Sequence, residues 1–182
     1  VTKLFIDGPT MEIGIVIASF MLVLSHQSNM ISNDPLTSLL NRMQFERDLA
    51  FRISDYKDDR PFFMAVIDLD HYRRETERHG WDAAQVGLKD FAEIVAHRCA
   101  GTSCVAYRYG GDEFAILGDY IDEMEKLVEK VKVDCDVYSE TSVIRVHPSI
   151  GVVKYERTYA TSAEFFDFGD RVMTDIKRRR SA

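Results

Sequence analysis

The chain has 182 residues, of which 46% are hydrophobic and 29% charged, and this composition excludes a disordered chain, a collagen-like repeat and a small disulfide-rich protein. Its formal net charge of −7 argues against a general nucleic-acid binder, which would carry a basic face, but leaves room for phosphate ligands held through metal ions. Cys99, Cys104 and Cys135 lack any Cys-x-x-Cys spacing, so we expect neither a disulfide framework nor a zinc site, and a reduced, cytoplasmic domain.

An apolar run near the N-terminus, residues 13–24 (IGIVIASFMLVL), contains no charged side chain. The run is too short to cross a bilayer, which takes about 20 apolar residues. It also lacks the basic start and the small-residue cleavage site of a secretion signal. Two interpretations remain open, the inner end of a membrane helix and a helical connector. Either way, we expect residues 1–33 to lead into a cytoplasmic domain that comprises residues 34–182.

The first half of this domain predicts a helix, a strand and a second helix. A turn at residues 33–35 (Asn-Asp-Pro) precedes a helix that we expect to run to about Asp55. Residues 62–69 (FFMAVIDL) form a continuous apolar run, which predicts a strand buried on both faces. Over residues 82–99, apolar side chains recur at spacings of three and four, which predicts an amphipathic helix.

The second half begins with a predicted hairpin. Residues 104–109 and 113–117 flank Gly110-Gly111-Asp112, and glycines supply the positive φ angles of tight hairpin turns. A helix over residues 121–131, a strand within 142–153 and a helix over 163–180 complete the chain. The order strand, helix, strand, strand, helix, strand predicts an α/β (α+β) fold of the ferredoxin-like βαββαβ plan, with a mainly antiparallel sheet flanked by helices.

Acidic residues stand at two chain reversals of this plan. Asp68 and Asp70 end the first long strand, and Asp112 and Glu113 lie at the hairpin tip. Because these strands are neighbours in a ferredoxin-like sheet, we expect the carboxylates to converge at one edge. For Asp68 alone a solvated loop residue is the ordinary interpretation. With the hairpin pair added, the pattern favours a hard divalent cation, Mg²⁺ or Mn²⁺, that also binds substrate phosphates.

Residues 108–114 read RYGGDEF, and other segments extend the pattern. Residues 34–37 (DPLT) with Asn41-Arg42, residues 68–73 (DLDHYR) and residues 149–152 (SIGV) complete a resemblance to the GGDEF domain, the diguanylate cyclase family. It covers almost all of residues 34–180. The resemblance implies a nucleotidyl cyclase palm that condenses two GTP molecules into cyclic di-GMP, with release of pyrophosphate, across a homodimer.

The resemblance also implies roles for single residues. Asp68, Asp112 and the main-chain carbonyl of Leu69 would bind the metal, and Asp112 would take the proton of the 3′-hydroxyl. Glu113 would complete the catalytic acidic edge, and a lysine of the closing helix would pair with phosphate. The expected nucleotide-binding positions are Tyr72, Arg73, Thr76, Gln85, Gly110, Gly111 and Lys177.

Three departures from the family pattern affect ligand binding. Thr76 and Gln85 stand where the family has the Asn and Asp that read guanine, so we expect weakened guanine recognition. Gly101 and Cys104 replace the Arg and Asp of the product-inhibition motif, so that site is expected to be absent. Residues 178–180 (RRR) can replace a missing arginine, but a solvated basic tail is the interpretation we favour.

Two classes of function remain open. In the first, the chain is a cyclase that uses GTP or a related nucleotide as a homodimer, without a nucleic-acid partner. In the second, it is a noncatalytic GGDEF-like module that binds a nucleotide or dimerises and relays a signal, with membrane contact possible through the N-terminal run. The intact acidic tip favours the first class, because a domain released from catalysis has little reason to keep carboxylates that repel one another. The altered base-reading positions favour the second.

Overall fold

The computed structural model describes residues 13–21 and 32–181, which belong to two units, residues 1–32 and residues 33–182. In the first unit, residues 13–21 form a helix whose side chains are exposed. Residues 22–24 of the apolar run lie outside the described residues. Across the part of the chain that is described, no helix combines the length and the apolar character needed to span a bilayer.

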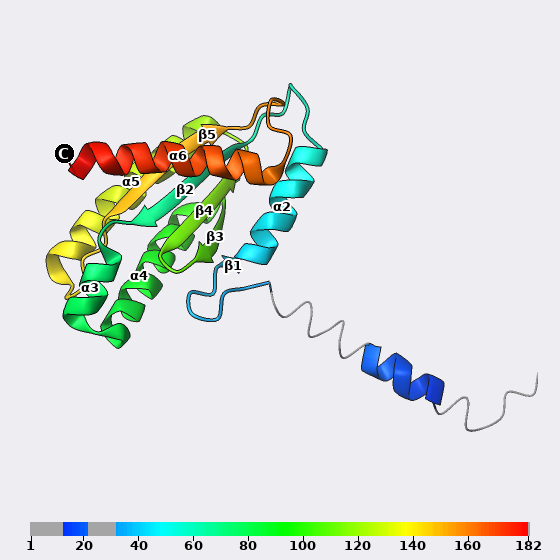
Figure 1. Ribbon diagram of the computed structural model, residues 1–182, viewed down its shortest axis with the longest axis horizontal. Helices are drawn as coiled ribbons and strands as arrows, with labels where there is room; N and C mark the ends of the chain where they lie inside the picture. Colours follow the sequence, from blue (N-terminus) through cyan, green and yellow to red (C-terminus); the bar gives the residue numbers. More distant parts are fainter. Residues whose placement is uncertain (1–12, 22–31, 182) are drawn as a thin grey trace, which may run out of the picture. The chain divides into compact units, whose positions relative to one another are not determined.

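The second unit contains a five-stranded sheet in the order β1-β3-β4-β2-β5 (Figure 1). Its four long strands are antiparallel to their neighbours, and the short β1 pairs with β3 in parallel. This arrangement confirms the predicted ferredoxin-like plan with a mainly antiparallel sheet. The strands are β1 (Leu40–Asn41), β2 (Phe63–Leu69), β3 (Val105–Gly110), β4 (Glu113–Gly118) and β5 (Pro148–Lys154).

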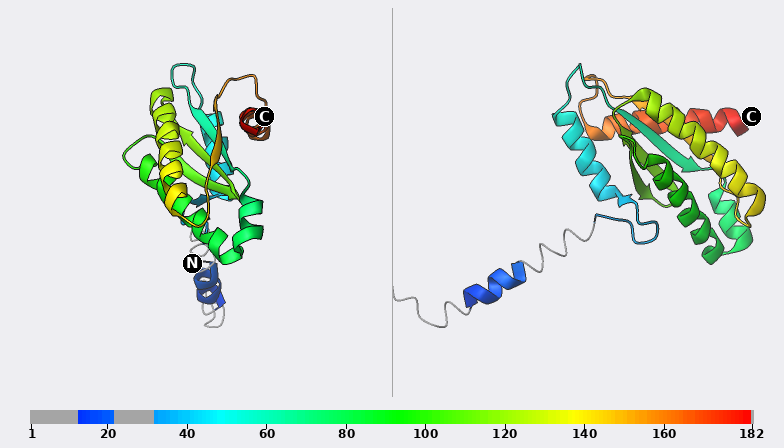
Figure 2. Two further views of the ribbon diagram at one scale, coloured as in Figure 1. Left: turned by 90° about the vertical axis from the view of Figure 1, so that its left-hand side faces the viewer. Right: turned by 180° about the vertical axis from the view of Figure 1, so that it is seen from behind.

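Helices cover both faces of the sheet, with α4 and α5 on one face and α2 and α6 on the other (Figure 2). Strand β2 lies between the two layers: Ala65 and Ile67 pack in the core beneath α4 and α5, whereas Met64 and Val66 pack in the core beneath α2 and α6. The continuous apolar run is therefore a strand buried on both faces, as predicted. The helices are α2 (Arg42–Ser54), α3 (Tyr72–His79), α4 (Trp81–Cys99), α5 (Ile121–Thr141) and α6 (Ser162–Ser181).

One predicted boundary was wrong and one helix was missed. The helix predicted over residues 82–99 is confirmed as α4, and the missed helix α3 precedes it, separated from it at Gly80, whose φ of +88° belongs to the left-handed region. The expected strand over residues 142–153 begins only at Pro148 in β5, because α5 continues ten residues beyond its expected end at Val131. Cys135 and Ser139 lie one and two helical turns beyond Val131 and are buried against the same core, which explains the extension.

Candidate active site

The carboxylates of Asp68 and Asp70 lie where β2 ends. In the sheet register, Asp68 stands opposite Glu113 of β4 on one side and Ser149 of β5 on the other. The side chains of Asp68 and Asp70 are 18% and 14% exposed, so both carboxylates are held close to the protein rather than in bulk water. The Ser149 hydroxyl is 2.8 Å from Oδ1 and 3.0 Å from Oδ2 of Asp70, to which it donates.

The β3–β4 hairpin brings its acidic tip to the same end of β2. The backbone N–H of Leu69 donates to the carbonyl of Asp112 at 3.3 Å, which ties the tip to the strand end. Gly111 has a φ of +52°, which a residue with a side chain adopts only at a cost. The Arg108 guanidinium donates to the carbonyl of Gly111 at 2.8 and 3.1 Å and fixes this turn.

The acidic groups interact electrostatically. Burial raises the pKa of Asp112, and the charge of Asp68 raises it further, against the opposing charges of Lys177 and Arg108. Burial also raises the pKa of Glu113, and the charges of Asp68 and Asp112 add to this rise. Like charges that repel in this way are a configuration that a cation stabilises. The structure therefore brings Asp68, Asp112 and Glu113 together at one end of the neighbouring strands β2 and β4, as the topology predicted. We call this end of the sheet the acidic edge.

The last turns of α6 add two cations to this edge. Lys177 forms an ion pair with Asp68 and lies 3.8 Å from Oδ1 of Asp70. Arg180 lies 3.7 Å from Oδ2 of Asp70 and donates to the carbonyl of Pro148 at 2.9 Å. Burial lowers the pKa of Lys177, but the hydrogen bond to Asp68 and the charges of Asp68, Asp70 and Asp112 outweigh it, so the pKa lies above its usual value.

Residues 178–180 are exposed, as expected for a solvated basic tail, but Arg180 also contacts the acidic edge. Arg178 is exposed and lies 3.9 Å from Asp175 of the same helix, as expected for a solvated tail. Arg180 is different, because it reaches the acidic edge. The contact of Arg180 with Asp70 places a guanidinium beside the site, where the resemblance implies an arginine that this chain lacks at the family position.

The acidic edge has the chemistry of a site for a hard cation. Within residues 13–21 and 32–181, no group of three or more Cys, His, Asp and Glu side chains is arranged to hold an ion. The donors that fit Mg²⁺ or Mn²⁺ are the carboxylates of Asp68 and Asp112 and the carbonyl of Leu69, all oxygen atoms at adjoining strand ends. The Asp68 carboxylate also forms an ion pair with Lys177.

The expected base-reading residues lie on α3 and α4. Thr76 donates its hydroxyl to the carbonyl of Tyr72 at 3.0 Å, so the hydrogen of that hydroxyl serves the helix backbone. Gln85 is half-buried near the start of α4. Arg73, the expected counterpart of a family lysine, is exposed and pairs with Glu77 at 3.0 Å, one turn further along α3.

Tyr72 carries a buried hydroxyl with no hydrogen-bond partner among the described residues. Burial raises the pKa of Tyr72, and the charge of Asp112 adds to the rise, whereas the Thr76 side chain and the charge of Arg108 oppose it. The hydroxyl is therefore close to the acidic tip and to Thr76. Both Tyr72 and Thr76 occupy positions at which this chain departs from the pattern it resembles.

The sequence of the second unit matches the model of a known protein family. The sequence model of the family described as "Diguanylate cyclase, GGDEF domain" matches residues 31–182. The chain belongs to the GGDEF domain family. The similarity identified from short motifs thus extends over the whole second unit.

Individual relatives agree with this membership. The chain is 27% identical over 164 residues to the diguanylate cyclase DgcP of Pseudomonas aeruginosa, covering 85% of this chain and 24% of DgcP. It is 28% identical over 152 residues to MucR of the same species, a bifunctional diguanylate cyclase/cyclic di-GMP phosphodiesterase, covering 80% of this chain and 22% of MucR. The chain spans about a quarter of the length of these relatives.

Solved structures share the fold. The coiled coil and GGDEF domain of DgcB from Caulobacter crescentus, in complex with c-di-GMP, superposes with a TM-score of 0.77 at 18% identity, covering 94% of this chain and 95% of that one. The GGDEF domain of TpbB (YfiN) from P. aeruginosa gives a TM-score of 0.70 at 25% identity, covering 81% of this chain and 89% of that one. The five-stranded sheet flanked by helices is thus the GGDEF fold.

Two polar residues of this GGDEF domain were not singled out from the sequence for the contacts they make. Ser149 donates to Asp70. The feature of the sequence that could have indicated this contact is the place of Ser149 in the SIGV strand, β5, which pairs directly with β2. Arg108 fixes the hairpin by donating to the Gly111 carbonyl. The feature of the sequence that could have indicated this contact is the place of Arg108 shortly before the glycine pair. Each side chain positions an acidic group: Ser149 holds the Asp70 carboxylate, and Arg108 holds the hairpin turn that carries Asp112.

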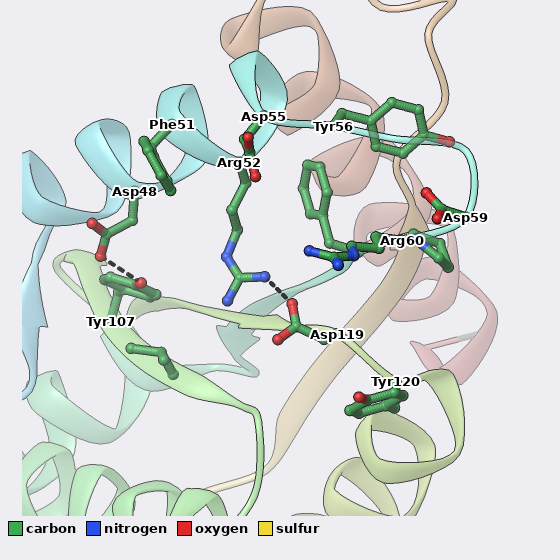
Figure 3. A pocket seen from close by; sticks show the side chains of 13 residues that line it. Asp48, Phe51, Arg52, Asp55, Tyr56, Asp59, Arg60, Tyr107, Asp119 and Tyr120 are labelled. Carbon is green, nitrogen blue, oxygen red and sulfur yellow. Dashed lines mark hydrogen bonds and ion pairs between the residues drawn. The ribbon is translucent and has the colours of Figure 1, made fainter.

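A cavity of about 820 Å³ lies away from the acidic edge of the GGDEF domain (Figure 3). It is lined by α2, the loop that follows it, the start of β3 and the segment after β4, roughly 20 Å along β4 from Glu113. Two of its acids are paired: Asp48 accepts from the Tyr107 hydroxyl at 2.8 Å, and Asp119 pairs with Arg52. This cavity is therefore separate from the candidate active site.

Proposed function

We propose that this GGDEF domain is a diguanylate cyclase that condenses two GTP molecules into cyclic di-GMP, with release of two pyrophosphates. The reaction takes place across a homodimer, because each domain offers one half-site and the product needs two nucleotides. The observation that supports this proposal is the meeting of Asp68, Asp112 and Glu113 at one sheet edge with Lys177 beside them.

The proposed chemistry is two identical substitutions at phosphorus. The 3′-hydroxyl oxygen of one nucleotide bonds to the α-phosphorus of the other, and the bond from that phosphorus to the pyrophosphate oxygen breaks. Asp112 accepts the hydroxyl proton, a role that suits a carboxylate whose pKa is raised by burial and by Asp68. A Mg²⁺ or Mn²⁺ ion bound by Asp68, Asp112 and the Leu69 carbonyl would supply positive charge to the phosphates. Glu113 adds a further carboxylate to this edge, and Lys177 binds phosphate as a point charge.

The two glycines of the hairpin support close approach of a nucleotide. A Cβ atom at Gly110 would meet nothing within 4 Å, and the φ of Gly110 is not in the left-handed region. The fold itself therefore does not require glycine at position 110, whereas the φ of +52° favours glycine at position 111. A ligand that packs against the hairpin backbone would explain the first glycine.

In this proposal the guanine base is contacted by two residues that differ from those of the family pattern. Thr76 keeps its hydroxyl lone pairs as acceptors, because its hydrogen goes to the Tyr72 carbonyl. Gln85 offers both a donor and an acceptor on a neutral amide. We therefore propose that GTP is bound with less discrimination against other purine nucleotides than in a family member that has the Asn and Asp.

The alternative function is a noncatalytic module that binds a nucleotide or dimerises and relays a signal. The positions of Thr76 and Arg73 favour it, because one hydroxyl hydrogen is used within α3 and the guanidinium pairs with Glu77. In either case we propose that residues 1–33 connect the domain, residues 34–182, to a partner segment or a membrane and that the domain works in the cytoplasm.

A product assay separates the two functions. The protein is held as a dimer by an N-terminal leucine zipper, incubated with Mg²⁺ and each of the four nucleoside triphosphates, and its products are identified by mass spectrometry. Thr76→Asn combined with Gln85→Asp is expected to raise GTP turnover about tenfold, since each recovered hydrogen bond contributes about 0.5–1.5 kcal/mol. Asp112→Ala is expected to abolish turnover. If neither the wild type nor the double variant forms a cyclic dinucleotide, the cyclase function is wrong and the signalling module remains.

A further inference from the structure

The cavity between α2 and the segment after β4 has two large aromatic side chains exposed beside it (Figure 3). Phe51, on α2, is 69% exposed, and Tyr120, directly before α5, is 63% exposed. The cavity volume of about 820 Å³ falls within the range of about 300–1,000 Å³ that small-molecule sites occupy. Large apolar groups exposed at a hollow of this size are a common feature of binding sites.

The charges of this cavity are unbalanced. Its lining residues include four aspartates but only two arginines, which leaves an excess of negative charge. Arg52 pairs with Asp119 across the cavity. Within the described part of the chain, by contrast, Asp55, Asp59 and Arg60 take part in no ion pair, and all three are exposed. The cavity therefore offers two unpaired carboxylates and one unpaired guanidinium.

Arginines of the chain itself show which kind of group this region binds. The Arg52 guanidinium, besides its ion pair, lies 6.0 Å from the centre of the Phe62 ring. In the same region, the Arg157 guanidinium pairs with Asp58 at 3.2 Å and lies 5.4 Å from the centre of the Tyr56 ring. In both cases a carboxylate and an aromatic ring hold one cation. The exposed rings and the unpaired carboxylates of the cavity provide the same two components.

We propose that this cavity binds a small aliphatic dication that carries a guanidinium or ammonium group at each end. Its charged ends would pair with Asp55 and Asp59, and its hydrocarbon chain would pack on the rings of Phe51 and Tyr120. Two positive charges balance the negative excess of the cavity. Arg60, whose guanidinium points into the cavity, opposes such a ligand and limits its affinity (Figure 3). The site is independent of the proposed cyclase function, because none of its residues belongs to the acidic edge.

A titration of the nitrogen-15-labelled protein with agmatine, followed by amide chemical shifts at low ionic strength, tests this proposal. Agmatine has a guanidinium and an ammonium group joined by a short methylene chain. We expect its largest shifts within residues 51–62 and 119–120, which line the cavity. The matched control ligand is 4-guanidinobutanoate, in which a carboxylate replaces the aminomethyl group. It is expected to bind about tenfold more weakly, because one of its ends is repelled by the cavity.

Charge variants locate the ligand. Asp55→Asn combined with Asp59→Asn is expected to weaken agmatine binding about tenfold. The matched control combines Asp136→Asn with Asp175→Asn, which removes the same charge from side chains 67% and 66% exposed on α5 and α6, and is expected to stay within about twofold. Arg60→Gln is expected to tighten agmatine binding about threefold, because it removes a repulsive charge.

A ring variant tests the apolar contact, and three results would overturn the proposal. Phe51→Ala is expected to weaken agmatine binding about threefold, and the amide spectrum verifies the fold of each variant. An equal loss in the two double variants would show that agmatine responds only to net charge. Tighter binding of 4-guanidinobutanoate, or weaker agmatine binding in Arg60→Gln, would show that the cavity takes an anion. The absence of shifts around the cavity at millimolar agmatine would show that it takes no such cation.

Discussion

Arg108 connects the turn before α2 to the tip of the hairpin through Asp34. One guanidinium nitrogen of Arg108 donates to Oδ1 of Asp34 at 2.9 Å, while two others donate to the carbonyl of Gly111. Asp34 also accepts from the backbone N–H and the hydroxyl of Thr37 at 2.8 and 2.7 Å. The Arg108 and Asp34 side chains are 13% and 18% exposed, so this is a partly buried pair that holds the acidic tip indirectly.

The stability contributed by this pair depends on pH. Burial tends to raise the pKa of Asp34, but hydrogen bonds from Arg108 and Thr37 outweigh it, so the pKa lies below its usual value of 3.8. A lowered carboxyl pKa stabilises the fold above the unfolded value, and this stabilisation is lost as the pH falls through the folded value. We expect Asp34→Asn to lower the free energy of unfolding by about 1–3 kcal/mol at pH 7. The loss relative to wild type is expected to shrink below about pH 4.

Urea denaturation of the wild type and Asp34→Asn between pH 7 and pH 3 measures this difference. Glu46→Gln serves as the control, because Glu46 and Arg42 form an ion pair on α2 with side chains 55% and 60% exposed. Exposed pairs contribute little, so this control is expected to change stability by less than about 0.5 kcal/mol. A loss for Asp34→Asn that stays the same at pH 3 would show that packing, not charge, explains the effect.

The two hairpin glycines are expected to respond differently to alanine. Gly111→Ala forces a side chain into the left-handed region and is expected to lower stability by about 1–2 kcal/mol. Gly110→Ala places a methyl group in open space and is expected to change stability by less than about 0.5 kcal/mol. Its effect should appear instead in weaker binding of 3′-deoxy-GTP with Mg²⁺, measured by calorimetry. Unchanged binding by Gly110→Ala would remove the argument that the nucleotide approaches this backbone.

Much of the acidic edge follows from topology that the sequence reveals. The apolar run of β2 ends in Asp68, and the glycine pair sets a turn directly before Asp112, so the strand order alone puts these residues at one edge. The helix α3 was missed because its sequence, YRRETERH, contains a single apolar side chain, that of Tyr72, which is too few to set up a helical pattern. Its one buried residue is Glu75, which accepts from the backbone N–H of Arg145.

The contacts of α6 could not be predicted from the sequence. The resemblance implied a phosphate partner for Lys177, but the ion pair with Asp68 depends on how α6 lies across β5 and β2. A residue's position in a closing helix does not reveal which strand end it reaches, because the rotation of the helix is set by packing. Met173 illustrates this, since its backbone lies so close to Gly151 of β5 that a Cβ atom at Gly151 would come within 2.5 Å of the Met173 nitrogen.

The buried hydroxyl of Tyr72 gives the last prediction, which concerns stability. A buried hydroxyl without a partner costs about 1–3 kcal/mol, because its hydrogen bonds to water are lost on folding, and the Tyr72 hydroxyl has no hydrogen-bond partner of normal geometry within the described part of the chain. Tyr72→Phe keeps the ring and removes this cost, so we expect a higher melting temperature and a higher free energy of unfolding. The matched control is Tyr138→Phe, whose lost hydroxyl donates to Asp90 at 2.6 Å and whose removal is expected to lower stability. Thermal and urea unfolding of both variants measure the difference. A loss of stability in Tyr72→Phe would show that its hydroxyl has a partner, such as an ordered water, and that Tyr72 stabilises the domain through it.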